Sequence, residues 1–301
     1  MVTLKKRITK GKAAYYLSHT YRQKGKVRYK ETCIGEKIPS NIDSIRHEFM
    51  QGIYKEKWFG TFESIKKAHA DELAKTPSSA RKKNLESFTV RFTYDTSRIE
   101  GSKLTLRETG ALLLDGISPK DKPINDVKEA EGHRKAFYDM LAYKGDLSIG
   151  IVLAWHKKLL NETKPDMAGK IRDYNVYISN STFKPPSALE VQSYILEFFR
   201  WYAHSEPKTN PVELVALAHL KFETIHPFGD GNGRIGRLIM NFILRKHGYP
   251  MLNIEYRDRR GYYKALEKSQ TKKDEGPFVL WFFKKYVKDN QGYLNGTKPA
   301  V

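Results

Sequence analysis

The 301-residue sequence contains one cysteine, Cys33, which excludes an internal disulfide and argues against a cysteine-ligated metal site. No segment approaches the roughly 18 consecutive apolar residues of a membrane span, and the longest apolar run is only Phe278–Phe283. The N-terminus also lacks the apolar core of a signal peptide. These absences predict a cytoplasmic protein that does not associate with membranes.

Acidic side chains are scarce relative to basic ones: 34 Asp and Glu stand against 54 Lys and Arg, a formal net charge of +20. Nearly half of this excess lies in residues 1–40, where eleven basic residues face only Glu31 and Glu36. A basic segment of this kind binds nucleic acid or an acidic protein, or is simply a solvated surface. Composition leaves these alternatives open.

Residues 1–40 predict a small antiparallel β module. The residue types typical of strands, Tyr, Val, Ile and Thr, are concentrated in Ala13–Tyr21 and Lys26–Ile34. Between them, Arg22–Gly25 has the composition of a hairpin turn with a terminal glycine. We expect one more strand near residues 4–9.

Helical periodicity dominates residues 41–290, including a helix at about residues 79–101. Residues 169–180 interrupt it, because their polar and apolar side chains alternate as in a β-strand. Residues 291–301 are expected to form a C-terminal tail. The predicted fold class is therefore mainly α, preceded by the small β module.

The segment His226–Arg237, with the sequence HPFGDGNGRIGR, carries the residue types that suit a polyphosphate. Its glycines allow backbone N–H groups to approach anionic oxygens, its arginines offer forked donors, and its aspartate can hold a divalent cation. Helices are predicted before it at Pro211–Ile225 and after it at Arg234–His247. The loop therefore begins the second helix, whose N-terminus favours an anion.

This string resembles the signature of the Fic family, His-x-Phe-x-(Asp/Glu)-Gly-Asn-Gly-Arg-x-x-Arg, at every fixed position. Fic proteins are mostly AMP-transferases that move AMP from ATP to a protein hydroxyl. The resemblance therefore implies a Fic-type helical bundle with this activity. It also implies that residues 169–180 form a β-hairpin flap, which would hold a target protein in an extended form beside the site.

The resemblance assigns roles to individual residues. His226 would be the general base, and Asp230 would hold Mg²⁺ together with the phosphates of ATP. Backbone amides of residues 231–233 would form an anion hole, and the two arginines would neutralise the polyphosphate. The expected nucleotide-binding set is Asp230, Gly231, Asn232, Gly233, Arg234, Gly236, Arg237, Tyr263 and Gln270. The other histidines, including His156 and His219, are expected to be structural.

The segment Thr96–Gly101, TSRIEG, resembles a second Fic pattern, (Ser/Thr)-x-x-x-Glu-(Gly/Asn), at the end of a predicted helix. In such proteins the glutamate, here Glu100, pairs with the second arginine of the signature, here Arg237. That pair keeps the γ-phosphate from its productive position. Thr96 and Gly101 complete the inhibitory motif, and Glu100 is also a candidate for positioning water in the removal of AMP.

The sequence thus predicts an autoinhibited protein adenylyltransferase that uses ATP and Mg²⁺ to modify a Ser, Thr or Tyr hydroxyl of a target protein and of itself. One alternative is a Fic-fold transferase with another donor, and another is a de-AMPylase. A third is a nucleic-acid-binding regulator that acts through residues 1–40. The sequence does not identify the target, and it leaves a homodimer open.

Overall fold

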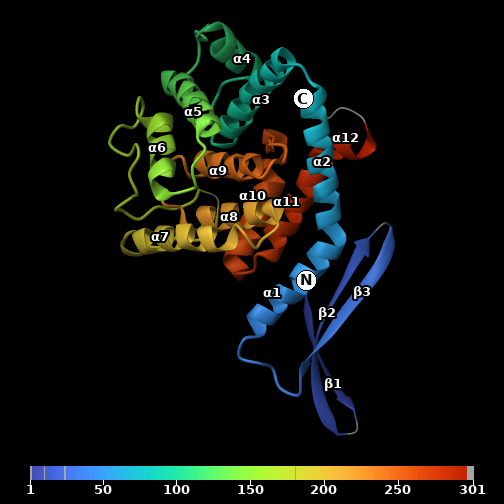
Figure 1. The fold of residues 1–301 in the computed structure, drawn as a ribbon. Coiled ribbons are helices and arrows are strands. Elements are labelled where there is room, and N and C mark those ends of the chain that lie inside the picture. The colour runs from blue at the N-terminus through green and yellow to red at the C-terminus, as the bar shows by residue number, and fades with distance from the viewer. Residues whose placement is uncertain (1, 10, 24, 180, 297–301) are drawn as a thin grey trace. The chain divides into compact units, whose positions relative to one another are not determined.

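The computed structural model describes residues 2–9, 11–23, 25–179 and 181–296. The chain divides into two compact units, Met1–Ser64 and Ile65–Val301 (Figure 1). No helix in these described ranges is both long enough and apolar enough to cross a bilayer.

The first unit contains an antiparallel sheet of three strands, β1 (Thr3–Thr9), β2 (Lys12–Gln23) and β3 (Lys26–Gly35), in sequence order. This confirms the predicted β module. The unit continues through α1 (Ile42–Tyr54) and the π-helical turn η1 (Lys55–Phe59), and so extends beyond residue 40.

The sheet of the first unit has one apolar face, which is covered by α1. Leu17 on β2 is fully buried and clusters with Phe49 and Ile53 of α1. Because side chains alternate across a strand, the neighbours of Leu17 point to the opposite face. That alternation gives this sheet one face toward its helix and one outer face.

The second unit is helical. A connecting helix, α2 (Gly60–Lys75), leads into it from the first unit. The remaining helices are α3 (Ser78–Ile99), α4 (Leu106–Asp115), α5 (Ile124–Ala142), α6 (Ile149–Leu160), α7 (Ala188–Ser205), α8 (Pro211–Ile225), α9 (Asn232–Lys246), η2 (Tyr256–Asp258), α10 (Arg259–Lys272), α11 (Gly276–Asp289) and α12 (Gln291–Asn295).

Helix α8 lies at the centre of this unit, between α7, α9, α10 and α11. Twelve of its fifteen residues are buried, as expected for a helix that is apolar on most of its surface. It begins with Pro211 in the first turn, and the side chain of Asn210 accepts a hydrogen bond from the Val212 N–H. This rigid setting fixes the position of the loop that joins α8 to α9.

The prediction of a β-hairpin flap at residues 169–180 is wrong for the residues described. No strand occurs in residues 169–179 or 181–186, and residue 180 lies outside the described ranges. Arg172 explains the difference: its backbone N–H donates to the Pro227 carbonyl at 3.0 Å, and its guanidinium donates to the carbonyl oxygens of His226, Tyr174 and Pro186. The segment is therefore fastened to the α8–α9 loop instead of pairing with itself.

The start of the predicted C-terminal tail is ordered as the short helix α12. The ring of Tyr293 meets that of His69 on α2 edge to face, and its hydroxyl lies 2.9 Å from His69 Nδ1. Residues 297–301 of the predicted tail lie outside the described ranges.

Candidate active site

The histidine predicted as a base stands at the junction of α8 and the loop. His226 is the C-cap of α8, and its backbone adopts a left-handed conformation with φ 50°. Its N–H donates to the Phe222 carbonyl at 2.9 Å, and its own carbonyl accepts from Arg172 Nε at 2.9 Å. A left-handed backbone is costly for a residue with a Cβ. These bonds on both sides of the peptide hold it in place.

Burial lowers the pKa of His226 to about 4, although a hydrogen bond with the Glu223 backbone and the nearby Glu100 and Asp230 charges oppose that shift. The imidazole is therefore neutral at pH 7 and has a lone pair to accept a proton. Its side chain keeps 20% of its surface exposed, so a proton donor can reach it from solvent.

The other end of the loop is an anion-binding helix terminus. Gly231 is the N-cap of α9, and the backbone N–H groups of Asn232 and Gly233 belong to its first turn, where a helix has no internal partner for them. The side chain of Asn232 is engaged elsewhere, because its amide accepts from the Phe228 N–H at 2.9 Å and donates to the Phe228 carbonyl at 2.8 Å. Asn232 thus shapes the loop with its side chain and leaves its backbone amide for an anion.

His156 on α6 packs against the same loop and hydrogen-bonds to it. Its ring stacks on Phe228 with centroids 3.8 Å apart, its Nε2 lies 2.9 Å from the Asp230 carbonyl, and its Nδ1 accepts from the Gly169 N–H. Burial lowers its pKa to about 4. It is a neutral structural histidine, as predicted.

Asp230 is surrounded by cationic side chains. One carboxylate oxygen lies 2.5 Å from Lys164 Nζ, and the other lies 3.1 Å from Arg234 Nη2. Glu129 on α5 binds both of these cations. Burial opposes ionisation of Asp230, but Arg234 and Lys164 outweigh it and hold its pKa below the usual range.

These residues fit a divalent cation at Asp230. An ammonium already stands at its carboxylate, which remains 36% exposed, so the position accepts positive charge. Mg²⁺ commonly takes one or two carboxylates and completes its shell with phosphates and water. The described residues contain no preformed cluster of three or more His, Cys, Asp or Glu side chains, so the remaining ligands would come from the nucleotide and water.

The second arginine of the loop motif is bound to the residues predicted to inhibit it. Arg237 is almost fully buried, and its Nη2 lies 2.6 Å from Glu100 Oε1. Its Nε donates to Thr96 Oγ1 at 2.7 Å, and Nη2 donates to the Thr96 carbonyl at 3.1 Å. Glu100 is the C-cap of α3, and Gly101 follows it with φ 102°. The structure therefore brings together all three residues of the predicted inhibitory motif.

Gly233 makes this ion pair sterically possible. A Cβ added at residue 233 would lie 2.2 Å from Glu100 Oε1 and 3.0 Å from Arg237 Nη1. Either the carboxylate or an anionic ligand can approach the first turn of α9 only because no side chain projects there.

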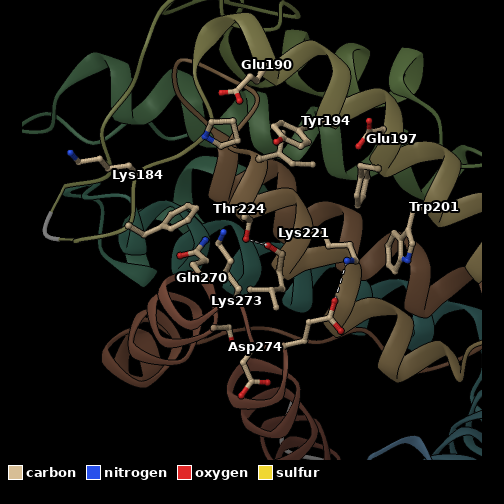
Figure 2. Close-up of a pocket in the computed structure, with 17 residues that line it drawn as sticks. Lys184, Glu190, Tyr194, Glu197, Trp201, Lys221, Thr224, Gln270, Lys273 and Asp274 are labelled. Atoms are coloured by element: carbon tan, nitrogen blue, oxygen red, sulfur yellow. Dashed lines mark hydrogen bonds and ion pairs between the residues drawn. The ribbon is translucent and has the colours of Figure 1, made fainter. Parts of the chain in front are cut away.

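The two residues expected at the nucleotide base lie in different surroundings. Tyr263 is 43% exposed, and its hydroxyl lies 3.5 Å from the Ile99 carbonyl at the end of α3. Gln270 is buried and lines a cavity of about 620 Å³ between α7, α8 and the C-terminal end of α10 (Figure 2). None of residues 226–237 lines this cavity, which reaches the catalytic loop only at Ile225.

Sequence reasoning missed three charged residues of the site. Glu129 and Lys164 form the ionic network around Asp230 and Arg234, and Arg172 clamps the loop carbonyls. They come from α5 and from irregular segments far from the loop in sequence, and no local pattern distinguishes them from surface charges. Arg172 lies within the alternating residues 169–180, and that pattern does not indicate its contacts with the loop.

Comparison with known proteins agrees with this geometry. Residues 146–244 match the model of the Fic/DOC family. The chain is 31% identical to protein adenylyltransferase fic-1 of Caenorhabditis elegans over 229 residues, covering 74% of this chain and 44% of that protein. It is 29% identical to protein adenylyltransferase Fic of Nematostella vectensis, covering 75% of this chain and 54% of that protein. The chain thus spans about half the length of these curated relatives.

A solved structure of Fic-1 from C. elegans, residues 134–508, superposes with a TM-score of 0.71 at 26% sequence identity. The match covers 85% of this chain and 76% of that one. The helical arrangement around α8 and α9 is therefore that of the solved relative.

Proposed function

Because this chain belongs to the Fic/DOC family, we propose that it transfers AMP from ATP to a hydroxyl of a target protein. The observation that carries the proposal is the neutral, partly exposed His226 at the start of a loop that leads into the N-terminus of α9, whose first turns carry the buried Arg234 and Arg237. A base, an anion-binding terminus and two forked cations within twelve residues match the needs of phosphoryl chemistry.

The choice of the α-phosphorus rests on the family resemblance, and the residues described supply the groups for each step. His226 takes the proton of the target hydroxyl as its oxygen attacks the α-phosphorus, the bond to the β-phosphate oxygen breaks, and pyrophosphate leaves. The amides of the first turn of α9 hold the phosphate oxygens, while Arg234 neutralises their charge. Asp230 would hold Mg²⁺, which when bound supplies further positive charge to the phosphates.

We propose that the protein is autoinhibited in its resting state. Arg237 is occupied by Glu100 and Thr96, so its guanidinium is not available to a γ-phosphate. A carboxylate at the first turn of α9 also repels a triphosphate. We therefore expect low basal transfer, and we expect release of Glu100 to activate the enzyme.

The target would dock along residues 173–178, beside the loop. This segment is non-helical, and Tyr177 in it is 81% exposed. Strand addition to such a segment would present an extended target chain to His226. Gln270 would contact the nucleotide base from the cavity of Figure 2, whose wall it forms.

Mass spectrometry of the Glu100→Gly variant incubated with ATP and Mg²⁺ tests the reaction. Gain of AMP on the protein itself, abolished by adding His226→Ala, supports the proposal. Gain of phosphate alone would show that the bound triphosphate is attacked at a different phosphorus. A panel of nucleoside triphosphates and a phosphocholine donor distinguishes ATP from the alternative donors, and incubation of a purified AMP-modified protein tests the reverse activity.

The outer face of the sheet supports a second function, nucleic-acid binding. Lys5 lies against the ring of Tyr29, and Arg7 lies over Tyr16 at 4.7 Å and pairs with Glu31 at 2.7 Å. These contacts place all five residues on the face opposite Leu17. Strand alternation adds Lys12 and Arg22, so four basic side chains share this face with a single acid, Glu31. Phosphates are the ligands that such basic and hydroxyl groups commonly bind on β-sheet surfaces.

Fluorescence anisotropy with duplex DNA at several salt concentrations tests this second function. We expect Lys5→Glu/Arg7→Glu/Arg22→Glu to lose binding and to reduce the salt slope by about three counterions. The control reverses three exposed lysines of the second unit, Lys67, Lys82 and Lys83. Equal binding by both triple variants would exclude the sheet face as the contact surface.

A further inference from the structure

Glu223 is a buried carboxyl that neither the loop motif nor the proposed reaction uses. It lies on α8 one turn before His226 and is 7% exposed. Its Oε2 is 4.0 Å from His226 Nδ1. Among the described residues, Glu223 Oε1 is buried without a hydrogen-bond partner, and the buried His226 Nδ1 has no side-chain partner, although the backbone of Glu223 interacts with the ring and favours its protonated form. The oxygen nearest the imidazole is therefore Oε2, which lies just beyond hydrogen-bonding distance of Nδ1, whereas the unpartnered Oε1 lies beside Gly236.

The neighbouring helix leaves space for this carboxyl. A Cβ added at Gly236 would lie 2.5 Å from Glu223 Oε1 and 3.0 Å from the His219 ring. Gly236 occupies a position where the Fic signature accepts any residue, so the signature does not explain this glycine. Because Gly236 has no side chain, the Glu223 carboxyl on α8 has room beside it.

The remaining surroundings offer Glu223 little compensation. His219, one turn earlier on α8, uses its Nε2 on the Tyr262 hydroxyl at 2.7 Å, and its Nδ1 is also buried without a partner. Arg237 attracts a negative charge on Glu223, but Glu100 repels it. An unsatisfied buried polar group typically costs about 1–3 kcal/mol. An acid buried at this cost beside the base points to a role at the base.

We propose that Glu223 is a positioning residue that accepts a hydrogen bond from His226 Nδ1–H in the active enzyme. A small rotation of the imidazole closes the present gap. The bond places the proton of the neutral ring on Nδ1 and leaves the lone pair on Nε2, the nitrogen that faces the target hydroxyl. A carboxyl oxygen can accept this bond whether Glu223 is neutral or ionised, so the orientation of the ring does not depend on the charge of Glu223.

Other charged groups also act on His226, and the test must separate them from Glu223. Glu100 from α3 and Asp230 from the loop favour its protonation, whereas Arg172 opposes it. The Glu100→Gly background removes the first of these and provides measurable transfer. The kinetic part of the inference rests on the proposed function, but the tautomer of His226 does not.

The first measurement is ¹⁵N NMR of histidine-labelled protein, with His226→Ala identifying the resonance. In the Glu100→Gly background we expect the Nδ1–H tautomer to predominate. Glu223→Leu should shift the ring toward a mixture of tautomers. Gly236→Ala keeps Glu223 but should also shift the ring toward a mixture of tautomers, because the added Cβ displaces the Glu223 carboxyl. This second variant allows the test if Glu223→Leu does not fold.

The second measurement is the pH dependence of AMP transfer. We expect Glu223→Leu to lower kcat about tenfold or more with KM for ATP unchanged. Glu223→Gln, which can still accept from Nδ1–H, should restore the tautomer and part of kcat. Glu213→Gln, a buried acid in the first turn of the same helix, is the matched control and should leave the His226 resonance unchanged.

An unchanged tautomer and an unchanged pH profile in folded Glu223→Leu and Gly236→Ala would overturn the inference. Failure of every Glu100→Gly protein to transfer AMP would count against the proposed function instead. In that event the NMR comparison still decides whether Glu223 orients His226.

Discussion

The guanidinium of Arg237 and the carboxylate of Glu100 form an ion pair with Nη2 and Oε1 only 2.6 Å apart, one partner buried and the other 29% exposed. The pair joins the end of α3 to the first turns of α9 across 137 residues of sequence. A γ-phosphate would need the same guanidinium. Arg237 would therefore either pair with Glu100 in the resting protein or bind the nucleotide during the reaction, but not both.

Glu100→Gly should therefore change activity and stability in opposite directions. Removal of the carboxylate leaves Arg237 buried with fewer acceptors, which we expect to cost about 1–3 kcal/mol of unfolding free energy. ATP-dependent self-modification should rise at least tenfold. Thermal unfolding with and without ATP and Mg²⁺ checks the first part, because ATP should raise the Tm of the variant more than that of the wild type. An equal ATP response in both proteins would contradict the competition between Glu100 and phosphate.

Gly233→Ala should couple energetically to Glu100. With Glu100 present, the new methyl group would lie 2.2 Å from its carboxylate, so the ion pair must separate. In the Glu100→Gly background only the 3.0 Å approach to Arg237 remains, and we expect a smaller loss of stability. A double-mutant cycle by chemical denaturation measures the difference. Activity should be lost in both backgrounds, since the methyl group also occupies the approach to the first turn of α9.

The sequence allowed the central helices and their ends to be predicted, because their signals are local. Pro211 begins α8, and Thr105 and Glu108, three residues apart, form a capping box at the start of α4. The loop residues were predictable as a group because all eight fixed positions of one signature match within residues 226–237. The pairing of Glu100 with Arg237 was predictable only from a resemblance, since nothing local links residues 137 positions apart.

The rest of the site depends on contacts that local patterns do not contain. Lys164 meets Asp230 across 66 residues, and Glu129 meets Arg234 across 105. The alternating residues around Arg172 led to the wrong expectation of a hairpin, because alternation describes a strand but does not supply a partner for it. Arg172 instead donates hydrogen bonds to backbone carbonyl oxygens of the neighbouring loop.

Lys164→Met should increase the affinity of the site for divalent cations. The ammonium of Lys164 lies 2.5 Å from Asp230 and competes there with a metal ion for the same carboxylate. We expect the Mg²⁺ concentration for half-maximal transfer in the Glu100→Gly background to fall several-fold. Direct titration with Mn²⁺, followed by electron paramagnetic resonance, measures the affinity independently of catalysis. Lys135→Met, which removes a lysine from an exposed ion pair with Glu162, is the control and should leave the metal affinity unchanged.

Glu223→Gln should remove a pH-dependent penalty on folding. Burial raises the pKa of Glu223 to about 8 in the folded protein, against an ordinary value of 4.5. For a group whose folded pKa is raised, the stabilising contribution is complete below the unfolded pKa and is lost as pH rises through the folded pKa. The wild type should thus lose stability relative to the Gln variant between about pH 4.5 and about pH 8, by at most a few kcal/mol at about 1.4 kcal/mol per pH unit. Chemical denaturation of both proteins at pH 5, 7 and 9 measures this difference, since their other titrating groups are shared. A constant difference over that range would show that Glu223 is ionised in the folded protein throughout, which would place a full negative charge beside His226 in the resting state.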